Sequence, residues 1–345
     1  MDERIHVLVV DDSFLMRKVI SDIINSDPAL EVIGKAKDGK DAIEKTFSLK
    51  PDVVTLDVNL PLLDGLSVLE QIMKKQPTPV VMLSAYTRSG TSATIKALEL
   101  GAVDFIAKPS GEISLDLGKL KEEIINKVKM AAKIASDKFT ITAKPFVKDD
   151  AITDLKKVVV IGASTGGPKA VLDIIQCIPA NIQAAFIIVQ HMPKGFTLTF
   201  AERISWQSGI KAKEAEEGDV IISSKVYVAP AGYHMVLEKE HGLVRVRLTD
   251  DPLVNFVRPS IDVTMQSVVD IFGKDTLGVV LTGMGKDGLE GARSIKDKGG
   301  LIIVQDESTS VIWGMPKVIV DARLADKVLK LSEIPKAIIE HIEKN

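Results

Sequence analysis

The sequence predicts an α/β protein with two doubly wound domains, each built on a parallel sheet. Short apolar runs alternate with amphipathic stretches, once before and once after a polar segment near the middle of the chain. The runs are apolar throughout, which is typical of strands that are buried on both faces of a sheet. The length of 345 residues agrees with two domains of about 150 residues each.

The first half is predicted to hold five strands separated by helices. The stretch 14–25 places its apolar residues on one helical face, and another amphipathic helix is expected at 119–135. The expected strands span 5–10, 31–36, 53–57, 79–83 and 103–107.

The periodic pattern stops between residues 136 and 156, a polar stretch that Pro145 interrupts. We therefore predict a first domain at 1–135, a linker at 136–156 and a second domain at 157–345. Strands of the second parallel sheet are expected at 158–161, 185–189, 277–281 and 301–304. Shorter runs joined by turns predict an antiparallel excursion made of 220–222, 226–229, 235–238 and 243–248.

Composition excludes several classes of protein. The chain carries 44 Lys and Arg against 47 Asp and Glu, and neither half is basic, which disfavours nucleic-acid binding. The single cysteine, Cys177, excludes an internal disulfide and is expected in the core. The acidic start and the lack of an apolar run of about 18 residues predict a cytoplasmic protein without membrane insertion.

Polar residues follow four of the five strands expected in the first domain. Asp11 and Asp12 follow the first strand, Asp57 ends the third, Ser84 follows the fourth and Lys108 follows the fifth. The carboxyl ends of parallel strands share one edge of the sheet, so these side chains should converge. Converging carboxylates suit Mg²⁺, and one of them can act as a nucleophile toward a phosphoryl group, with the lysine and the hydroxyl binding the phosphoryl oxygens.

The segments VLVVDDS, PDVVTLDVNLPLLDG, VVMLSA and GAVDFIAKP make residues 5–130 resemble the response-regulator receiver family. The resemblance implies a flavodoxin-like fold and transfer of a phosphoryl group from a histidine kinase to Asp57. It also implies Mg²⁺ bound by Asp11, Asp12 and Asp57, and sensing of the phosphoryl group by Ser84, Phe105 and Lys108. Leu60 departs from the family, which usually has methionine there.

A second set of polar residues follows strands of the second domain. Ser164 lies in a glycine-rich turn after one strand, His191 follows the next, and Asp287 lies in a loop with Met284 after a third. A serine nucleophile, a histidine base and an orienting carboxylate can meet at such an edge whatever their separation in sequence. The chain order Ser, His, Asp and the missing G-x-S-x-G elbow do not fit the α/β-hydrolases.

Each of these residues also has an ordinary structural explanation. Ser164 and Asp287 could cap helices, and His191 could be a core histidine. The glycines of GASTGG could cradle a dinucleotide, but that reading needs an acidic residue where Gln190 and His191 stand.

The whole chain resembles the chemotaxis protein-glutamate methylesterases, the CheB family. The resemblance over 157–345 rests on VIGASTGGP, VQHMPKGF, YVAPAGYH, RPSIDVT, LTGMGKDG and QDESTSVIWGMP. It implies a Rossmann-like esterase domain with Ser164, His191 and Asp287 as the triad and the amide of Met284 in the oxyanion hole. Thr165 is a second candidate for that hole.

The family implies a phosphorylation-activated enzyme that demethylates glutamate methyl esters, and deamidates some glutamines, on the cytoplasmic helices of chemoreceptors. No cofactor is expected for the esterase. We also expect the unphosphorylated receiver to restrain it. A receptor-binding adaptor without catalysis stays open as an alternative, whereas a transcriptional regulator is disfavoured by the near-neutral second half.

Overall fold

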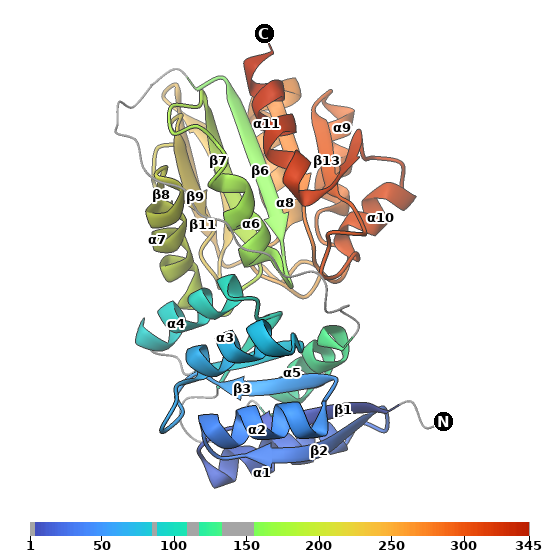
Figure 1. Cartoon of the computed structure of the whole chain (residues 1–345). Helices are drawn as coiled ribbons and strands as arrows, with labels where there is room; N and C mark the ends of the chain where they lie inside the picture. The colour runs from blue at the N-terminus through green and yellow to red at the C-terminus, as the bar shows by residue number, and fades with distance from the viewer. Residues whose placement is uncertain (1–3, 85–87, 109–116, 133–154, 345) are drawn as a thin grey trace. The chain divides into compact units, whose positions relative to one another are not determined.

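The computed structural model describes residues 4–84, 88–108, 117–132 and 155–344, and the chain divides into two compact units, Met1–Thr142 and Ala143–Asn345. The linker expected at 136–156 lies outside the described residues, apart from Leu155 and Lys156. Each unit is considered by itself below (Figure 1).

The first unit is a five-stranded parallel sheet in the order β2-β1-β3-β4-β5. This order is the flavodoxin-like one, in which the switch point lies between β1 and β3, and it confirms the predicted fold. The strands are β1 (Ile5–Val10), β2 (Leu30–Ala36), β3 (Val53–Asp57), β4 (Val80–Ser84) and β5 (Asp104–Ala107).

Helices connect these strands and form two groups. α1 (Phe14–Asn25) contacts α5 (Leu117–Ala131), whereas α3 (Gly65–Lys75) contacts both α2 (Gly39–Leu49) and α4 (Arg88–Glu99). The helix expected at 14–25 has the predicted bounds, because Ser13 caps its start by accepting a hydrogen bond from the Met16 amide at 3.4 Å.

The second unit is a seven-stranded sheet in the order β14-β13-β12-β6-β7-β9-β8, and every pair of neighbours is parallel. Its strands are β6 (Lys157–Ala163), β7 (Ala184–Gln190), β8 (Lys211–Glu214), β9 (Lys225–Val228), β12 (Thr276–Val280), β13 (Leu301–Gln305) and β14 (Lys327–Leu329). The antiparallel excursion is the separate pair β10 (His234–Glu240) and β11 (Leu243–Thr249).

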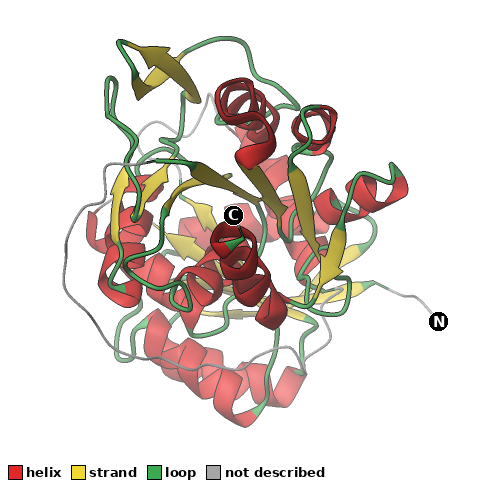
Figure 2. Ribbon diagram, turned by 90° about the horizontal axis from the view of Figure 1, so that it is seen from above, coloured by secondary structure: helices red, strands yellow, loops and turns green. Residues whose placement is uncertain are grey.

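Helices lie along both faces of this sheet (Figures 1 and 2). α6 contacts α7 and α11, while α9 contacts α8 and α10. They span α6 (Gly167–Ile175), α7 (Phe196–Ser208), α8 (Ile261–Phe272), α9 (Leu289–Asp297), α10 (Met315–Asp321) and α11 (Ile334–Glu343), and single 3₁₀ turns lie at Gly273–Asp275 and Leu331–Glu333.

Some expectations about this unit were wrong. The run at 226–229 is not part of the antiparallel excursion, because β9 pairs in parallel with β7. The run at 220–222 forms no strand, and only Val220 makes a bridge, to Arg245. The edge strands β8 and β14 were missed, since their mixed, partly exposed sequences lack an apolar run. Cys177 is exposed just beyond α6, not in the core.

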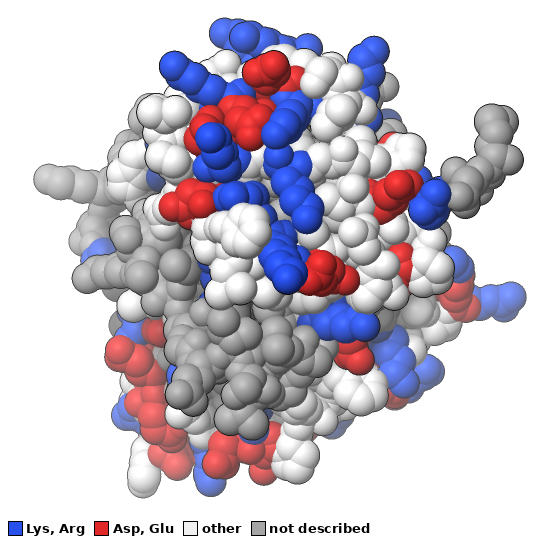
Figure 3. Space-filling view, turned by 90° about the horizontal axis from the view of Figure 1, so that it is seen from below, with Lys and Arg blue, Asp and Glu red and all other residues white. Residues whose placement is uncertain are grey.

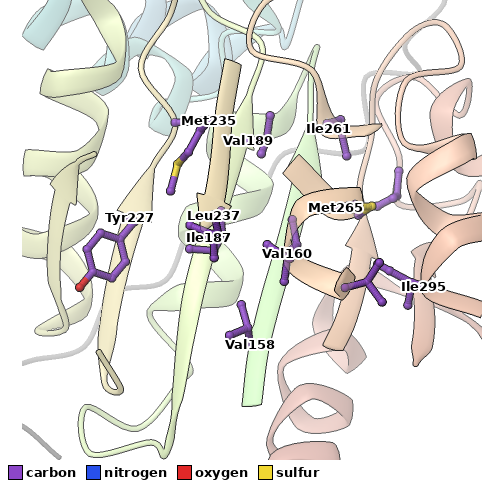
Figure 4. Packing of buried hydrophobic residues seen from close by; sticks show 14 of the residues in the cluster. Val158, Val160, Ile187, Val189, Tyr227, Met235, Leu237, Ile261, Met265 and Ile295 are labelled. Atoms are coloured by element: carbon purple, nitrogen blue, oxygen red, sulfur yellow. The ribbon is translucent and has the colours of Figure 1, made fainter. Parts of the chain in front are cut away.

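The strands bury side chains on both faces, as their apolar composition predicts. Val158 and Val160 of β6 pack with α8 and β10, through residues such as Met265 and Leu237 (Figure 4). Successive strand residues point to opposite faces, so the buried Val159 and Ile161 lie on the other face. The sheet is thus fixed on both sides, and its carboxyl edge can hold side chains in place.

Charge of both signs is present on the face of the chain drawn in Figure 3. The face drawn in Figure 3 shows basic and acidic side chains interspersed among uncharged ones. Among the described residues, none of the helices combines the length and apolarity that crossing a bilayer requires.

Candidate functional site

Two buried carboxylates and a lysine meet at the carboxyl edge of the first sheet. Asp11 follows β1 and Asp57 ends the neighbouring strand β3, while Lys108 follows β5. Lys108 Nζ lies 2.7 Å from Asp11 Oδ2 and 2.7 Å from Asp57 Oδ2. The structure thus brings together three residues that the sequence places at three strand ends.

Burial and the neighbouring charges together set the pKa values of Asp57 and Lys108. Asp57 is 2% exposed, and its burial raises the pKa of its carboxyl, with Asp11 adding to the rise and Lys108 opposing it. Burial by itself lowers the pKa of Lys108, but the two carboxylates outweigh it and raise that pKa. The lysine therefore stays charged beside the carboxylates.

The exposed Asp12 completes an acidic cluster with Asp11 and Asp57, whose ligand atoms all lie within 4.8 Å of one another. An all-oxygen donor set with an open side is what Mg²⁺ prefers. The residues present therefore fit the predicted ion.

The other two predicted sensing residues, Ser84 and Phe105, differ in their placement. Ser84 is buried at the end of β4, and its carbonyl accepts a hydrogen bond from the Lys108 amide at 2.7 Å. Phe105 is buried within β5, and Lys127 Nζ lies 5.2 Å from the centre of its ring. Ser84 thus lies at the edge that bears the carboxylates, whereas Phe105 lies further back along its strand.

In the second sheet, Ser164 and His191 follow the neighbouring strands β6 and β7. Ala163 pairs with Gln190, and the His191 amide donates to the Ala163 carbonyl at 3.1 Å. Ser164 and His191 are therefore the next positions in register. They lie on the same edge of the sheet, as predicted.

The backbone around Ser164 is held from several sides. Its amide donates to the Thr282 carbonyl at 3.0 Å, and its own carbonyl accepts from the Gly167 amide at 2.7 Å. Gln190 Nε2 donates to the carbonyls of Ser164 and His191, both at 3.0 Å. One buried amide therefore connects the residues that carry the candidate nucleophile and base.

Asp287 contacts the imidazole of His191, with Asp287 Oδ2 2.8 Å from His191 Nε2. The carboxylate also accepts from the Ser260 hydroxyl and the Ile261 amide, both at 2.7 Å, at the start of α8. Burial by itself would raise the pKa of Asp287, but His191 and these donors lower it to about 2. Asp287 is thus a buried, ionised partner for the imidazole.

The loop after β12 approaches Ser164 at a glycine. A Cβ atom on Gly283 would lie 2.7 Å from Ser164 Cβ and 2.5 Å from Met315 Sδ, so only glycine fits. The next residue, Met284, has a half-exposed side chain. Thr165 is buried, and its carbonyl accepts from Thr282 Oγ1 at 3.0 Å.

The glycine-rich turn is packed by the protein itself. A Cβ atom on Gly166 would lie 2.5 Å from Val311, and one on Gly167 would lie 2.2 Å from Gln190 Oε1. These glycines serve close internal contacts, which speaks against the dinucleotide cradle.

Sequence reasoning missed several residues around Asp287. Asn255, Ser260 and Asp262 belong to the VNFVRPSIDVT segment, whose chemistry depends on contacts that no local pattern reveals. His234, which has no companion motif in the sequence, accepts from the Ser260 amide at Nδ1 at 3.2 Å. The only signal available was the family motif RPSIDVT itself.

The two folds and the sites at their carboxyl edges are those of a receiver domain combined with a hydrolase domain. Comparison with known proteins gives the same class. The family description "CheB methylesterase" matches residues 159–338, and "Response regulator receiver domain" matches residues 7–117. The chain belongs to the CheB methylesterase family.

Curated relatives match over the full length. A protein-glutamate methylesterase/protein-glutamine glutaminase of Pyrococcus horikoshii is 47% identical, with 99% of this chain and 95% of the relative covered. One of Thermotoga maritima with the same name is 44% identical over 98% and 99%. The crystal structure of the Thermotoga maritima CheB methylesterase catalytic domain is 42% identical, with a TM-score of 0.53, covering 53% of this chain and 97% of that one.

Proposed function

We propose that this chain is a phosphorylation-activated hydrolase that removes methyl groups from glutamate methyl esters on chemoreceptors and deamidates certain receptor glutamines. The single observation that carries the proposal is the 2.8 Å contact between Asp287 and His191. His191 follows β7 and Ser164 follows the neighbouring strand β6, at the same edge of the sheet. The names of the full-length relatives support the choice of substrate.

In the proposed mechanism, Ser164 Oγ attacks the ester carbonyl while His191 removes the proton of the Ser164 hydroxyl. Asp287 orients the imidazole and stabilises the positive charge that forms on it. Methanol leaves, protonated by His191, and an acyl-enzyme remains on Ser164. Water activated by His191 then releases the glutamate, and ammonia takes the place of methanol in deamidation.

The oxyanion of each tetrahedral intermediate needs backbone N–H donors. We assign these to the amides of Thr165 and Met284. Gly283 allows the Met284 segment to approach Ser164, and Thr282 supports the Thr165 backbone through its hydroxyl. One such donor is typically worth about 10²- to 10³-fold in rate.

Control is proposed to act through Asp57, which takes a phosphoryl group from a chemotaxis histidine kinase. Asp11, Asp12 and Asp57 would hold Mg²⁺, which offsets the negative charge of the carboxylates and the phosphoryl group. A phosphoryl group adds about two negative charges beside Lys108, which already pairs with two carboxylates. The Lys108 ion pairs must then rearrange, and we propose that this relieves a restraint on the esterase.

The test is methanol release from methylated chemoreceptor, with and without a small-molecule phosphodonor. We expect release that rises with the phosphodonor and that Ser164→Ala abolishes. Normal folding and phosphoryl uptake by Ser164→Ala would serve as its control. Receptor binding without methanol release by the parent would instead establish the non-catalytic adaptor, and near-normal release by Ser164→Ala would overturn the assigned nucleophile.

A further inference from the structure

Asn255 lies between two buried carboxylates of the esterase domain. Its Nδ2 atom is 2.8 Å from Asp262 Oδ2 and 3.1 Å from Asp287 Oδ1. An asparagine amide carries two N–H groups, so it can donate one to each carboxylate. Asp262 and Asp287 are 4% and 3% exposed, so water screens the repulsion between their charges only weakly.

The two carboxylates also exchange helix caps. The amides of Ile261 and Asp262, which begin α8, donate to Asp287 at 2.7 and 3.3 Å. The amides of Gly288 and Gly291, at the start of α9, donate to Asp262 Oδ1 at 2.9 and 2.8 Å. Each helix start thus stabilises the carboxylate that the other segment carries.

At neutral pH Asp287 is ionised and Asp262 is mostly ionised. Burial raises the pKa of Asp262 to about 6, and the charge of Asp287 contributes to that rise. The two like charges repel, and the Asn255 amide is the group that donates to both of them. Of the pair, Asp287 is the one that contacts His191. A displacement of Asp287 would therefore change the position of His191, the proposed catalytic base.

The backbone holds the Asn255 amide in this position. Asn255 has φ +52° and the following Phe256 has φ +65°, and hydrogen bonds between Val254 and Val257 close the turn. Asparagine tolerates the left-handed region well, whereas phenylalanine does not. Phe256 is 94% exposed, so the inward-facing member of this turn is Asn255.

We propose that Asn255 and Asp262 are positioning residues for Asp287, the carboxylate that orients His191. Asp262 anchors the Asn255 amide, and the N–H that Asn255 donates to Asp287 holds that carboxylate toward His191 Nε2 and reduces its basicity, so that the imidazolium can return its proton to the leaving group. This inference rests on the proposed esterase function.

The test compares Asn255→Ala with the parent in the full chain under phosphodonor, with methylated receptor as substrate. We expect kcat to fall about 10- to 100-fold with KM little changed, because the carboxylate that orients His191 is misplaced whereas the substrate site is not. The acidic limb of the pH–rate profile should move to higher pH, because Asp287 with one donor fewer holds the protonated imidazole more strongly. A purely structural role would leave that limb in place.

Asn181→Ala is the matched control, since Asn181 lies in an exposed turn that precedes β7, at the opposite edge of the sheet. It should behave like the parent in kcat and in pH profile.

A second variant combines Asn255→Asp with Asp262→Asn. It exchanges donor and acceptor between positions 255 and 262, but it places a carboxylate against Asp287. Because the buried carboxylates at 255 and 287 repel, we expect its thermal midpoint and its turnover to stay at or below those of Asn255→Ala. Full recovery of turnover in this double variant, or an Asn255→Ala enzyme with the parent's kcat and pH limb, would overturn the inference.

These outcomes distinguish the role of Asn255 from the proposed esterase activity on which it rests. If the parent releases methanol and Ser164→Ala does not, the esterase assignment holds whatever Asn255→Ala does. If the parent releases none, both fail.

Discussion

His191 presents Nε2, and not Nδ1, to the carboxylate of Asp287, at 2.8 Å. An ionised carboxylate only accepts hydrogen bonds, so the proton of the neutral imidazole lies on Nε2. Nδ1 is then the nitrogen that is free to take the proton of the serine hydroxyl. This contact supports the proposed roles of Asp287 as the orienting carboxylate and His191 as the base.

Asp287→Asn tests this assignment. An asparagine can turn its NH₂ group toward Nε2, which favours the tautomer with its proton on Nδ1, and that nitrogen can then no longer act as a base. We expect kcat to fall about 10⁴-fold, as when the acid of a serine protease triad is changed in this way. Methanol release measures the rate, and ¹⁵N chemical shifts of the imidazole report the tautomer. A loss smaller than tenfold would contradict the assignment.

Gln190→Glu should damage both stability and turnover. Gln190 is 1% exposed and donates to two carbonyls, which a carboxylate cannot do. A buried charge facing carbonyl oxygens costs more than the lost hydrogen bonds, which are worth about 1 kcal/mol each. Denaturant unfolding of the full chain measures the loss, and Gln266→Glu, at an exposed position of α8, is the control. Equal midpoints for the two variants would argue against this role of Gln190.

Gly283→Ala should impair catalysis with little effect on the global fold. The added Cβ meets Ser164 Cβ at 2.7 Å, so the nucleophile must shift. A shift of about 1 Å can cost about 10²-fold in rate. Gly242→Ala is the control, because it strains a hairpin turn at φ +81° but meets nothing within 4 Å. Unchanged kcat in Gly283→Ala would show that this close approach does not matter for the reaction.

Asp57→Asn should abolish stimulation by phosphodonor and leave the basal esterase rate of the full chain in place. Lys108 would lose one of its two carboxylate partners, and no acceptor for the phosphoryl group would remain at that position. Glu70→Gln, on the exposed face of α3, controls for a lost negative charge in the receiver. If the phosphodonor still stimulates Asp57→Asn, Asp57 is not the residue through which the esterase is controlled.

The raised pKa of Asp262, about 6 in the folded protein, predicts how stability depends on pH. An unfolded aspartate has a pKa near 3.9, so between these values the folded state binds more protons than the unfolded state. Asp262 therefore favours folding fully below pH of about 4, and this contribution is lost as pH rises through about 6. The stability of the parent relative to Asp262→Asn should fall across this window and stay level above it. Thermal melts at a series of pH values check this, and a difference that does not vary with pH would exclude the shift.

The sequence was sufficient to predict both parallel sheets, because strands buried on two faces leave continuous apolar runs. It was insufficient for β8, whose Lys211 and Glu214 are partly or fully exposed at a sheet edge. The pairing of β9 with β7 was also missed, since four apolar residues do not reveal the direction of their partner.

Strand ends were the strongest guide to the sites. They predicted that Lys108 converges with Asp11 and Asp57 on one edge, and they placed Ser164 and His191 on one edge. The partners of Asp287 could not be predicted in this way. Asn255 and Ser260 reach it across about 30 residues of sequence, through a turn and a helix start that only the folded chain brings together. The triad itself stays a prediction until its rates are measured.

The exchanged caps of α8 and α9 make the starts of the two helices depend on each other. Neither helix start is complete without the other, and the carboxylate that serves one of them is also the one that faces His191. A displacement of either helix start would therefore also move the carboxylate that faces His191, so we expect the rate of hydrolysis to depend on both helices although neither carries the serine or the histidine.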